Sequence, residues 1–128
     1  MDCDTVTTRQ SILVVDDDPF MREMTRIHLE SAGHVVALAN GGAEGVAKAR
    51  SLGPAVIIMD FSMPGLTGTD TLKQIRADPD IAETPVLMLT AWSADDSRLE
   101  AEKLGATWLE KPLSGEALID AVRRMITS

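Results

Sequence analysis

The feature that most constrains this chain is the regular alternation of short apolar runs with longer segments of helical pattern. The runs are apolar on both faces, which is typical of parallel strands covered by helices on both sides. Alternation of strand and helix predicts a parallel sheet with right-handed crossovers, and therefore an α/β fold. The five predicted strands cover residues 12–15, 34–38, 55–59, 86–89 and 107–109.

Proline, glycine and capping residues delimit the predicted helices. Pro19 suits the first turn of a helix that ends at Gly33, and Gly53-Pro54 closes the next helix. With 128 residues the chain is too short for an eightfold barrel, so an open doubly wound sheet remains. The polar residues 1–10 are expected to form a flexible tail before a single domain over residues 11–127. The helices are expected over residues 19–32, 41–52, 68–77 and 93–104 and from Ser114 onward, with Thr67, Ser93 and Ser114 as caps.

Composition excludes several classes of protein. There are 12 Lys and Arg residues against 20 Asp and Glu residues, a net charge of −8, which argues against direct binding of nucleic acid. The apolar runs are far shorter than the about 20 residues of a membrane-spanning helix. The acidic start is unlike a signal peptide, and the single cysteine, Cys3, cannot form an internal disulfide. We therefore expect a cytoplasmic protein without membrane association.

Acidic and polar residues follow the predicted strands at the point where each strand ends. In an open parallel sheet, ligands bind outside the carboxyl ends of the strands, so these residues are expected to share one site. The second strand contributes only Ala39 and Asn40. The other strands contribute Asp16, Asp17, Asp18, Asp60, Thr90 and, in the loop after the fifth strand, Lys111.

This set of side chains is suited to phosphoryl transfer. Converging carboxylates repel one another, and a hard divalent cation such as Mg²⁺, which prefers oxygen ligands, relieves that repulsion. Thr90 supplies a hydroxyl and Lys111 a positive charge for a phosphoryl group. Asp60 is the most central carboxylate, so the pattern predicts Mg²⁺-assisted phosphoryl transfer to Asp60. Aspartates after strands are also common helix caps, and for Asp18, beside Pro19, we expect a cap.

Four segments resemble the receiver domain of two-component response regulators. They are VVDDD at residues 14–18, IIMDFSMPG at 57–65, LMLTA at 87–91 and KP at 111–112. The resemblance covers nearly the whole chain, residues 11–127. It implies a flavodoxin-like fold with a five-stranded parallel sheet in the order 2-1-3-4-5.

The resemblance also implies a role for each residue of the site. Asp60 corresponds to the phosphoacceptor and belongs to the metal site. Asp17 would bind Mg²⁺ directly, Asp16 would bind it through water, and Ser62 would lend its backbone carbonyl. The phosphoryl group itself would be contacted by Thr90, accommodated beside the small Ala91 and neutralised by Lys111.

Two tryptophans occupy positions where the family tunes switching and lifetime. Trp108 stands where the family usually has Tyr or Phe as the aromatic that moves together with Thr90. Ser62 and Trp92 would flank the path of the water that hydrolyses the acyl phosphate. A Trp92 ring folded over the pocket would slow hydrolysis, so we expect a long-lived phosphoryl group. A ring that points away onto the neighbouring helix is the alternative.

The resemblance implies a phosphoacceptor rather than an enzyme with a separate substrate, although the domain would catalyse its own phosphorylation and dephosphorylation. The donor would be a histidine kinase or a histidine phosphotransfer protein, and the output would be a changed contact with a downstream protein target. His28 and His34 are expected to be structural, so the phosphohistidine belongs to the partner. We expect a stand-alone protein, because no output domain follows residue 128. A piece of a larger regulator or hybrid kinase is the alternative.

Two other functions stay open. An aspartate-dependent phosphatase of the haloacid dehalogenase type shares the Asp16-x-Asp18 pattern, but it has Thr or Val where this chain has Phe20, and it would leave Asp60 idle. A degenerate receiver acting as a constitutive binding module is the third possibility, although every ligand position is filled. The residue that becomes phosphorylated distinguishes the first two functions, and the affinity for Mg²⁺ tests the third.

The first predicted helix carries more apolar surface than a core contact requires. Its apolar positions cover about 200° of the helical wheel, whereas a core-facing stripe needs somewhat over 100°. Part of this surface is therefore expected to stay exposed beside the acidic pocket. The resemblance implies partner docking at this helix, and packing against the last helix is the alternative.

Overall fold

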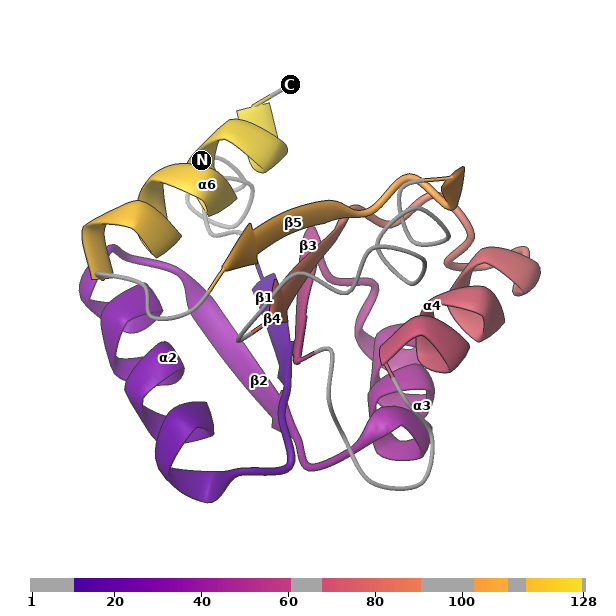
Figure 1. The fold of residues 1–128 in the computed structure, drawn as a ribbon, viewed down its shortest axis with the longest axis horizontal. Coiled ribbons are helices and arrows are strands. Elements are labelled where there is room, and N and C mark those ends of the chain that lie inside the picture. The colour runs from indigo at the N-terminus through magenta and orange to yellow at the C-terminus, as the bar shows by residue number, and fades with distance from the viewer. Residues whose placement is uncertain (1–10, 61–67, 91–102, 111–114, 128) are drawn as a thin grey trace, which may run out of the picture.

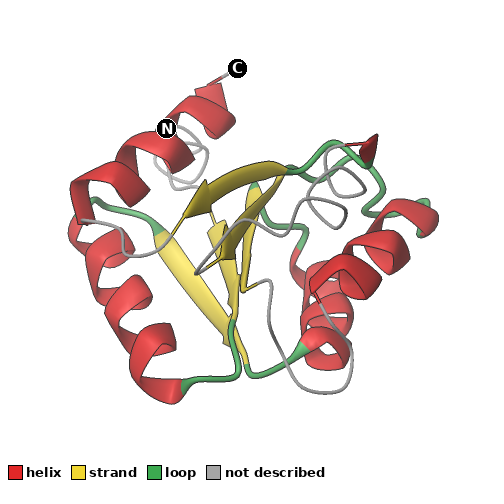
Figure 2. Ribbon diagram, viewed as in Figure 1, coloured by secondary structure: helices red, strands yellow, loops and turns green. Residues whose placement is uncertain are grey.

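A parallel sheet forms the centre of the molecule, with helices packed on both of its faces (Figure 1). The structure is a computed structural model that describes residues 11–60, 68–90, 103–110 and 115–127. Its strands are β1 (Ser11–Val15), β2 (Val35–Ala39), β3 (Val56–Asp60), β4 (Val86–Thr90) and β5 (Thr107–Glu110). Its helices are α2 (Pro19–Ser31), α3 (Gly42–Leu52), α4 (Gly68–Ala77) and α6 (Gly115–Thr127), and Figure 2 shows how strands and helices alternate.

All paired strands run parallel, in the spatial order β2-β1-β3-β4-β5. β1 lies between β2 and β3, with Val15 opposite Ala39 on one side and Met59 on the other. The parallel α/β architecture and the order β2-β1-β3-β4 confirm the predicted flavodoxin-like fold. At the far edge, β5 pairs with β4, and the ladder places Thr107 opposite Leu87.

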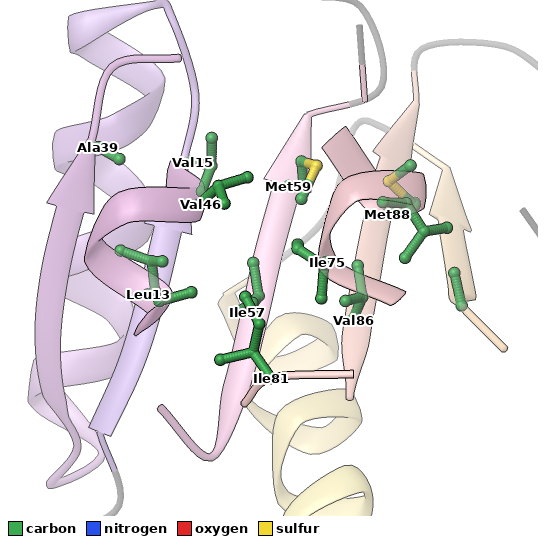
Figure 3. Packing of buried hydrophobic residues seen from close by; sticks show 13 residues of the cluster. Leu13, Val15, Ala39, Val46, Ile57, Met59, Ile75, Ile81, Val86 and Met88 are labelled. Carbon is green, nitrogen blue, oxygen red and sulfur yellow. The ribbon is translucent and has the colours of Figure 1, made fainter. Parts of the chain in front are cut away.

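The alternation of side chains along each strand divides the core into two clusters. Leu13 and Val15 of β1 point to the face that α3 and α4 cover, where they join Ile57, Met59 and the rest of a buried cluster (Figure 3). The intervening β1 residues, such as Ile12, join the cluster under α2 and α6 on the other face. Because the strands are apolar on both faces, the sequence could predict a sheet buried on both sides.

Local signals delimit the helices largely as predicted. α2 begins at Pro19 and ends one residue earlier than expected, at Ser31, with Ala32 as its C-cap. α3 begins at Gly42 and closes at Gly53, whose φ of 58° lies in the left-handed region that glycine adopts without strain. These ends fix where the chain turns back toward the sheet.

Arg76, at the end of α4, fastens two neighbouring segments to that helix. Its guanidinium donates to the backbone carbonyls of Ala82 and Thr84, at 3.0 and 2.7 Å, and to that of Leu104. Burial lowers the pKa of Arg76. The contact to Leu104 fixes the turn that leads into β5, so one side chain joins α4 to the edge of the sheet.

Some predictions concern residues outside the described part of the chain. They are the flexible tail over residues 1–10, most of the helix expected over residues 93–104, and the caps Thr67, Ser93 and Ser114. None of the described helices has the length and apolar character needed to cross a membrane.

Candidate functional site

Three carboxylates from two adjacent strands meet at the carboxyl edge of the sheet. Asp16 and Asp17 directly follow β1, and Asp60 is the last residue of β3. One oxygen from each of the three lies within 4.8 Å of the others. Asp16 and Asp60 are buried, whereas Asp17 is exposed. The convergence predicted from the strand ends is therefore present for these three residues.

The first turn after β1 holds Asp16 through its backbone and its side chain. Its N–H donates to the carbonyl of Ala39 at 3.1 Å, which extends the ladder with β2 by one bond. Its Oδ1 accepts from the N–H of Asp18 at 3.0 Å. Its carbonyl accepts from Nη1 of Arg22 at 2.8 Å. Hydrogen bonds to its N–H, its carbonyl and its carboxylate thus fix the position of Asp16.

Asp18 is a helix cap, as expected from its place beside Pro19. Its Oδ1 accepts from the N–H of Phe20 at 2.9 Å and from that of Met21 at 3.5 Å. These N–H groups lie in the first turn of α2, where they have no partner within the helix. Among the described residues, the carboxylate group that could hold a metal ion contains Asp16, Asp17 and Asp60 but not Asp18.

Two side chains of α3 hold the end of β2 and the loop that follows it, for which the sequence predicted no functional residue. Glu44 Oε1 accepts from the N–H of Asn40 at 2.7 Å, and Lys48 donates to the carbonyl of Leu38. The N–H of Asn40, and to a smaller extent the neighbouring Lys48 and Arg22, lower the pKa of Glu44. The segments that leave β1 and β2 lie together at the bottom of Figure 1, so both loops beside the site are fastened by helix side chains.

The geometry of the three carboxylates fits a small divalent cation. Mg²⁺ binds oxygen ligands octahedrally at about 2.1 Å, which places its ligand atoms about 3 to 4.2 Å apart. The limit of 4.8 Å on the three carboxylate oxygens is close to that spacing. Hard oxygen ligands and a concentration of negative charge also favour such a cation over a transition metal. The acidic group could therefore hold a metal ion at the carboxyl edge of the sheet.

For two other predicted site residues the structure gives the backbone position, and four more lie outside the described part of the chain. Thr90 is the last residue of β4, and Trp108 lies in β5 opposite Met88. Asp60 is paired with Leu89 in the register of β3 and β4, so Thr90 ends its strand at the same edge of the sheet. Ser62, Ala91, Trp92 and Lys111 lie outside the described residues.

Neither histidine belongs to the described group of residues that could hold a metal ion. His28, in α2, packs on the first turn of α6, where a Cβ atom at Gly115 would overlap its ring. His34 precedes β2, and burial, together with the charge of Arg123, lowers its pKa. Both environments fit the structural roles expected from the sequence.

Part of the apolar surface of α2 is exposed, as its helical pattern predicted. Phe20 has 68% of its surface accessible and Ile27 has 50%, and Met24 between them is also exposed. On the opposite side of the helix, Thr25 and Leu29 are buried. The exposure itself is confirmed, and the use of this face for docking stays a prediction.

Comparison with known proteins decides the family. The family described as the response regulator receiver domain matches residues 12–123. This chain belongs to the response regulator receiver family. As a receiver domain it is 34% identical to Protein PilH of Pseudomonas aeruginosa over 116 residues, which are 90% of this chain and 96% of PilH.

Other relatives of the receiver domain are longer proteins or solved structures. The DNA-binding response regulator MtrA of Mycolicibacterium smegmatis is 36% identical over 118 residues, and the match covers 91% of this chain but 50% of MtrA. The structure of the Vibrio cholerae chemotaxis protein CheY4 superposes with a TM-score of 0.86 at 36% identity, covering 91% of this chain and 98% of that one. The receiver domain is thus similar both to short proteins of its own length and to one half of longer regulators.

Proposed function

We propose that Asp60 is the phosphoacceptor of this receiver domain. The observation that carries the proposal is the position of Asp60 at the end of a central strand, with carboxylate oxygens of Asp16 and Asp17 within 4.8 Å. A carboxylate at this place can act as a nucleophile toward phosphorus, provided that the surrounding negative charge is compensated. Membership of the response regulator receiver family supports the same assignment.

The donor is a phosphohistidine of a histidine kinase or of a histidine phosphotransfer protein. A carboxylate oxygen of Asp60 forms the new O–P bond as the N–P bond to the donor imidazole breaks, and the imidazole takes up a proton. Asp17, Asp60 and the Ser62 carbonyl would hold Mg²⁺ directly and Asp16 would hold it through water, and the ion would supply positive charge that compensates the phosphoryl oxygens.

The remaining roles follow from the same proposal. Thr90 and Lys111 bind the phosphoryl oxygens, and a shift of Thr90 together with Trp108 changes the contacts that the domain makes with a downstream protein target. Ser62 and Trp92 set the access of water to the acyl phosphate and hence its lifetime. The working unit is the domain over residues 11–127, in the cytoplasm, with residues 1–10 as a tail.

Intact mass after incubation with acetyl phosphate and Mg²⁺ tests the phosphoacceptor directly. The wild-type protein should gain the mass of one phosphoryl group, and Asp60→Asn should gain none. Removal of Mg²⁺ with a chelator should also prevent the gain. Unchanged labelling of Asp60→Asn would refute the proposal.

The site of labelling also separates the receiver from the dehalogenase-type phosphatase. That mechanism needs Asp16 as nucleophile and Asp18 as acid and base. In this structure, Asp18 Oδ1 accepts hydrogen bonds from the first turn of α2. Labelling that persists in Asp60→Asn and is lost in Asp16→Asn would favour the phosphatase.

A further inference from the structure

The peptide group between Asp16 and Asp17 is held by a side chain that sequence patterns did not single out. Arg22 Nη1 donates a hydrogen bond of 2.8 Å to the carbonyl oxygen of Asp16, in partly buried surroundings. This carbonyl belongs to the peptide plane whose nitrogen is that of Asp17. Its orientation therefore helps to set the direction in which the Asp17 side chain leaves the backbone.

The position of Arg22 on α2 allows it to make this contact. The N–H of Arg22 donates to the carbonyl of Asp18 at 2.9 Å, which is the first hydrogen bond of the helix. Side chains in a helix point back toward its N-terminus, so a long side chain at this place covers the turn that precedes the helix. The guanidinium also lies near enough to Glu44 of α3 for its charge to lower the pKa of that carboxyl, after the larger effects of Asn40 and Lys48.

The contact between Arg22 and Asp16 lies beside three carboxylates that repel one another. Three carboxylates with oxygens within 4.8 Å of one another repel, and that repulsion favours movement of the exposed Asp17 away from the two buried aspartates. A hydrogen bond from a charged donor is stronger than one between neutral groups, and this one restrains the peptide that carries Asp17. Such a restraint opposes the displacement of Asp17 that the repulsion favours.

We propose that Arg22 is a positioning residue that prepares Asp16 and Asp17 for the divalent cation. Arg22 does not contact the cation itself but fixes the backbone from which two of its ligands project. This inference rests on the proposed function, because it deepens the metal site that the function requires. The gain is a smaller loss of conformational freedom when the cation binds.

A purely electrostatic role for Arg22 has the opposite sign. A positive charge next to a cation site repels the incoming ion, so loss of that charge alone would tighten Mg²⁺ binding. The positioning role predicts weaker binding instead. Measurement of Mg²⁺ affinity in a variant without the guanidinium thus separates the two roles by direction as well as by size.

Isothermal titration with Mg²⁺ is the deciding experiment, on the wild type, Arg22→Gln and Arg22→Lys. We expect Arg22→Gln to weaken Mg²⁺ binding about tenfold, the lower end of the range for groups that support metal ligands. Arg22→Lys keeps the charge but replaces the planar guanidinium with a compact ammonium group, so its affinity should lie between those of the wild type and Arg22→Gln. In the metal-free Arg22→Gln protein, the amide of Asp17 should exchange hydrogen faster than in the wild type.

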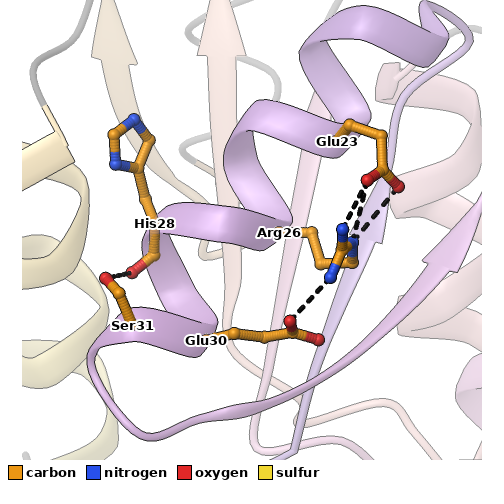
Figure 4. A network of polar contacts seen from close by, with 5 residues as sticks. All are labelled: Glu23, Arg26, His28, Glu30 and Ser31. Carbon is orange, nitrogen blue, oxygen red and sulfur yellow. Dashed lines mark hydrogen bonds and ion pairs between the residues drawn. The ribbon is translucent and has the colours of Figure 1, made fainter.

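Arg26→Gln provides the matched control. It removes the same charge from the same helix, but its guanidinium is bound to Glu23 and to Glu30 rather than to the loop (Figure 4). Its Mg²⁺ affinity should stay within about twofold of the wild type, since the charges of exposed pairs are well screened.

Equal or tighter Mg²⁺ binding by Arg22→Gln, relative to Arg26→Gln, would overturn the positioning role. If Arg22→Gln unfolds, the Mg²⁺ affinity of Arg22→Lys decides. An affinity equal to that of the wild type would contradict the positioning role, because it would show that the charge of residue 22 matters and the geometry of its guanidinium does not. Phosphorylation by acetyl phosphate is measured separately. A wild type that binds Mg²⁺ but is not phosphorylated refutes the phosphoacceptor and leaves the result for Arg22 standing.

Discussion

Three consecutive aspartates after β1 have three different environments, although their side chains are chemically identical. Asp16 is buried and held through its N–H, its carbonyl and one carboxylate oxygen. Asp17 is exposed but turns one oxygen toward Asp60, and Asp18 caps α2. The direction of the backbone at each residue determines whether its carboxylate is buried, faces Asp60 or caps the helix. At the scale of single residues, local geometry rather than residue type assigns function.

Asp78 gives a pH prediction that is independent of the metal site. This buried carboxylate follows α4 and accepts from the N–H of Asp80 at 2.9 Å, and Arg50 of α3 forms an ion pair with it. The N–H of Asp80, followed by Arg50, lowers the pKa of Asp78. A carboxyl whose pKa is lower in the folded state stabilises the fold above its unfolded value, here about 3.8, and that contribution is lost as the pH falls through the folded value.

We therefore expect Asp78→Asn to lower the free energy of unfolding at pH 7 and to make it less dependent on pH below about 4. Urea denaturation at several pH values measures both effects. Asp120→Asn, which removes one ion-pair partner of Arg124 on the surface of α6, should change stability much less. An acid dependence of Asp78→Asn as steep as that of the wild type would contradict the assignment.

At the scale of elements, the close approach of α3 to β1 links helix packing to the site. A Cβ atom at Gly45 would lie 2.8 Å from Cγ2 of Val15, closer than real atoms pack. Val15 is fully buried and directly precedes Asp16. The absence of a side chain at Gly45 thus lets the helix lie against the strand from which the carboxylates emerge.

Gly45→Ala should destabilise the fold by about 1–3 kcal/mol, because the overpacking at Val15 outweighs the gain of up to about 1 kcal/mol in helix propensity. Gly41→Ala is the control, since a Cβ atom there has open space and its φ of 179° is extended backbone. Chemical denaturation compares the two variants. If Gly45→Ala is as stable as Gly41→Ala, Val15 can move without cost and the packing argument is wrong.

The sequence predicted the type and the order of the described elements but not all of their ends. The second strand was expected over residues 34–38 and is Val35–Ala39, and the third was expected over residues 55–59 and is Val56–Asp60. Each shift of one residue follows a ladder partner that lies far away in the sequence, Val15 for Ala39 and Leu89 for Asp60. Periodicity reports which face of a strand is apolar, whereas the last paired residue depends on the neighbouring strand.

The sequence could predict the carboxylates of the candidate site but not the side chains that hold the neighbouring loops in place. Asp16, Asp17 and Asp60 stand at strand ends, so topology alone brings them together. Arg22, Glu44 and Lys48 act on backbone atoms of neighbouring loops, and any residue can present such atoms. Contacts of this kind leave no pattern of residue types, so only the three-dimensional structure could identify them.

At the scale of the whole molecule, the cluster of carboxylates adds to a chain that is already acidic. The net charge is −8, from 12 basic and 20 acidic residues. General screening by salt and specific binding of Mg²⁺ both reduce the resulting repulsion, but they differ in their dependence on Asp17. Screening acts on every charge near the surface, whereas binding at the proposed site would need the Asp17 carboxylate.

We expect Mg²⁺ to stabilise the folded chain beyond the effect of ionic strength. A ligand that binds only the folded state at ten times its Kd adds about 1.4 kcal/mol to the free energy of unfolding. The temperature of thermal denaturation should therefore rise by several degrees when MgCl₂ replaces NaCl at constant ionic strength.

Asp17→Asn should lose this shift and, without Mg²⁺, should be more stable than the wild type, because one repelling carboxylate is gone. Glu83→Gln, an exposed change before β4 at the opposite edge of the sheet, should keep the full shift. An equal response of Asp17→Asn and the wild type would place the stabilising ion elsewhere on the acidic surface and refute Asp17 as a ligand.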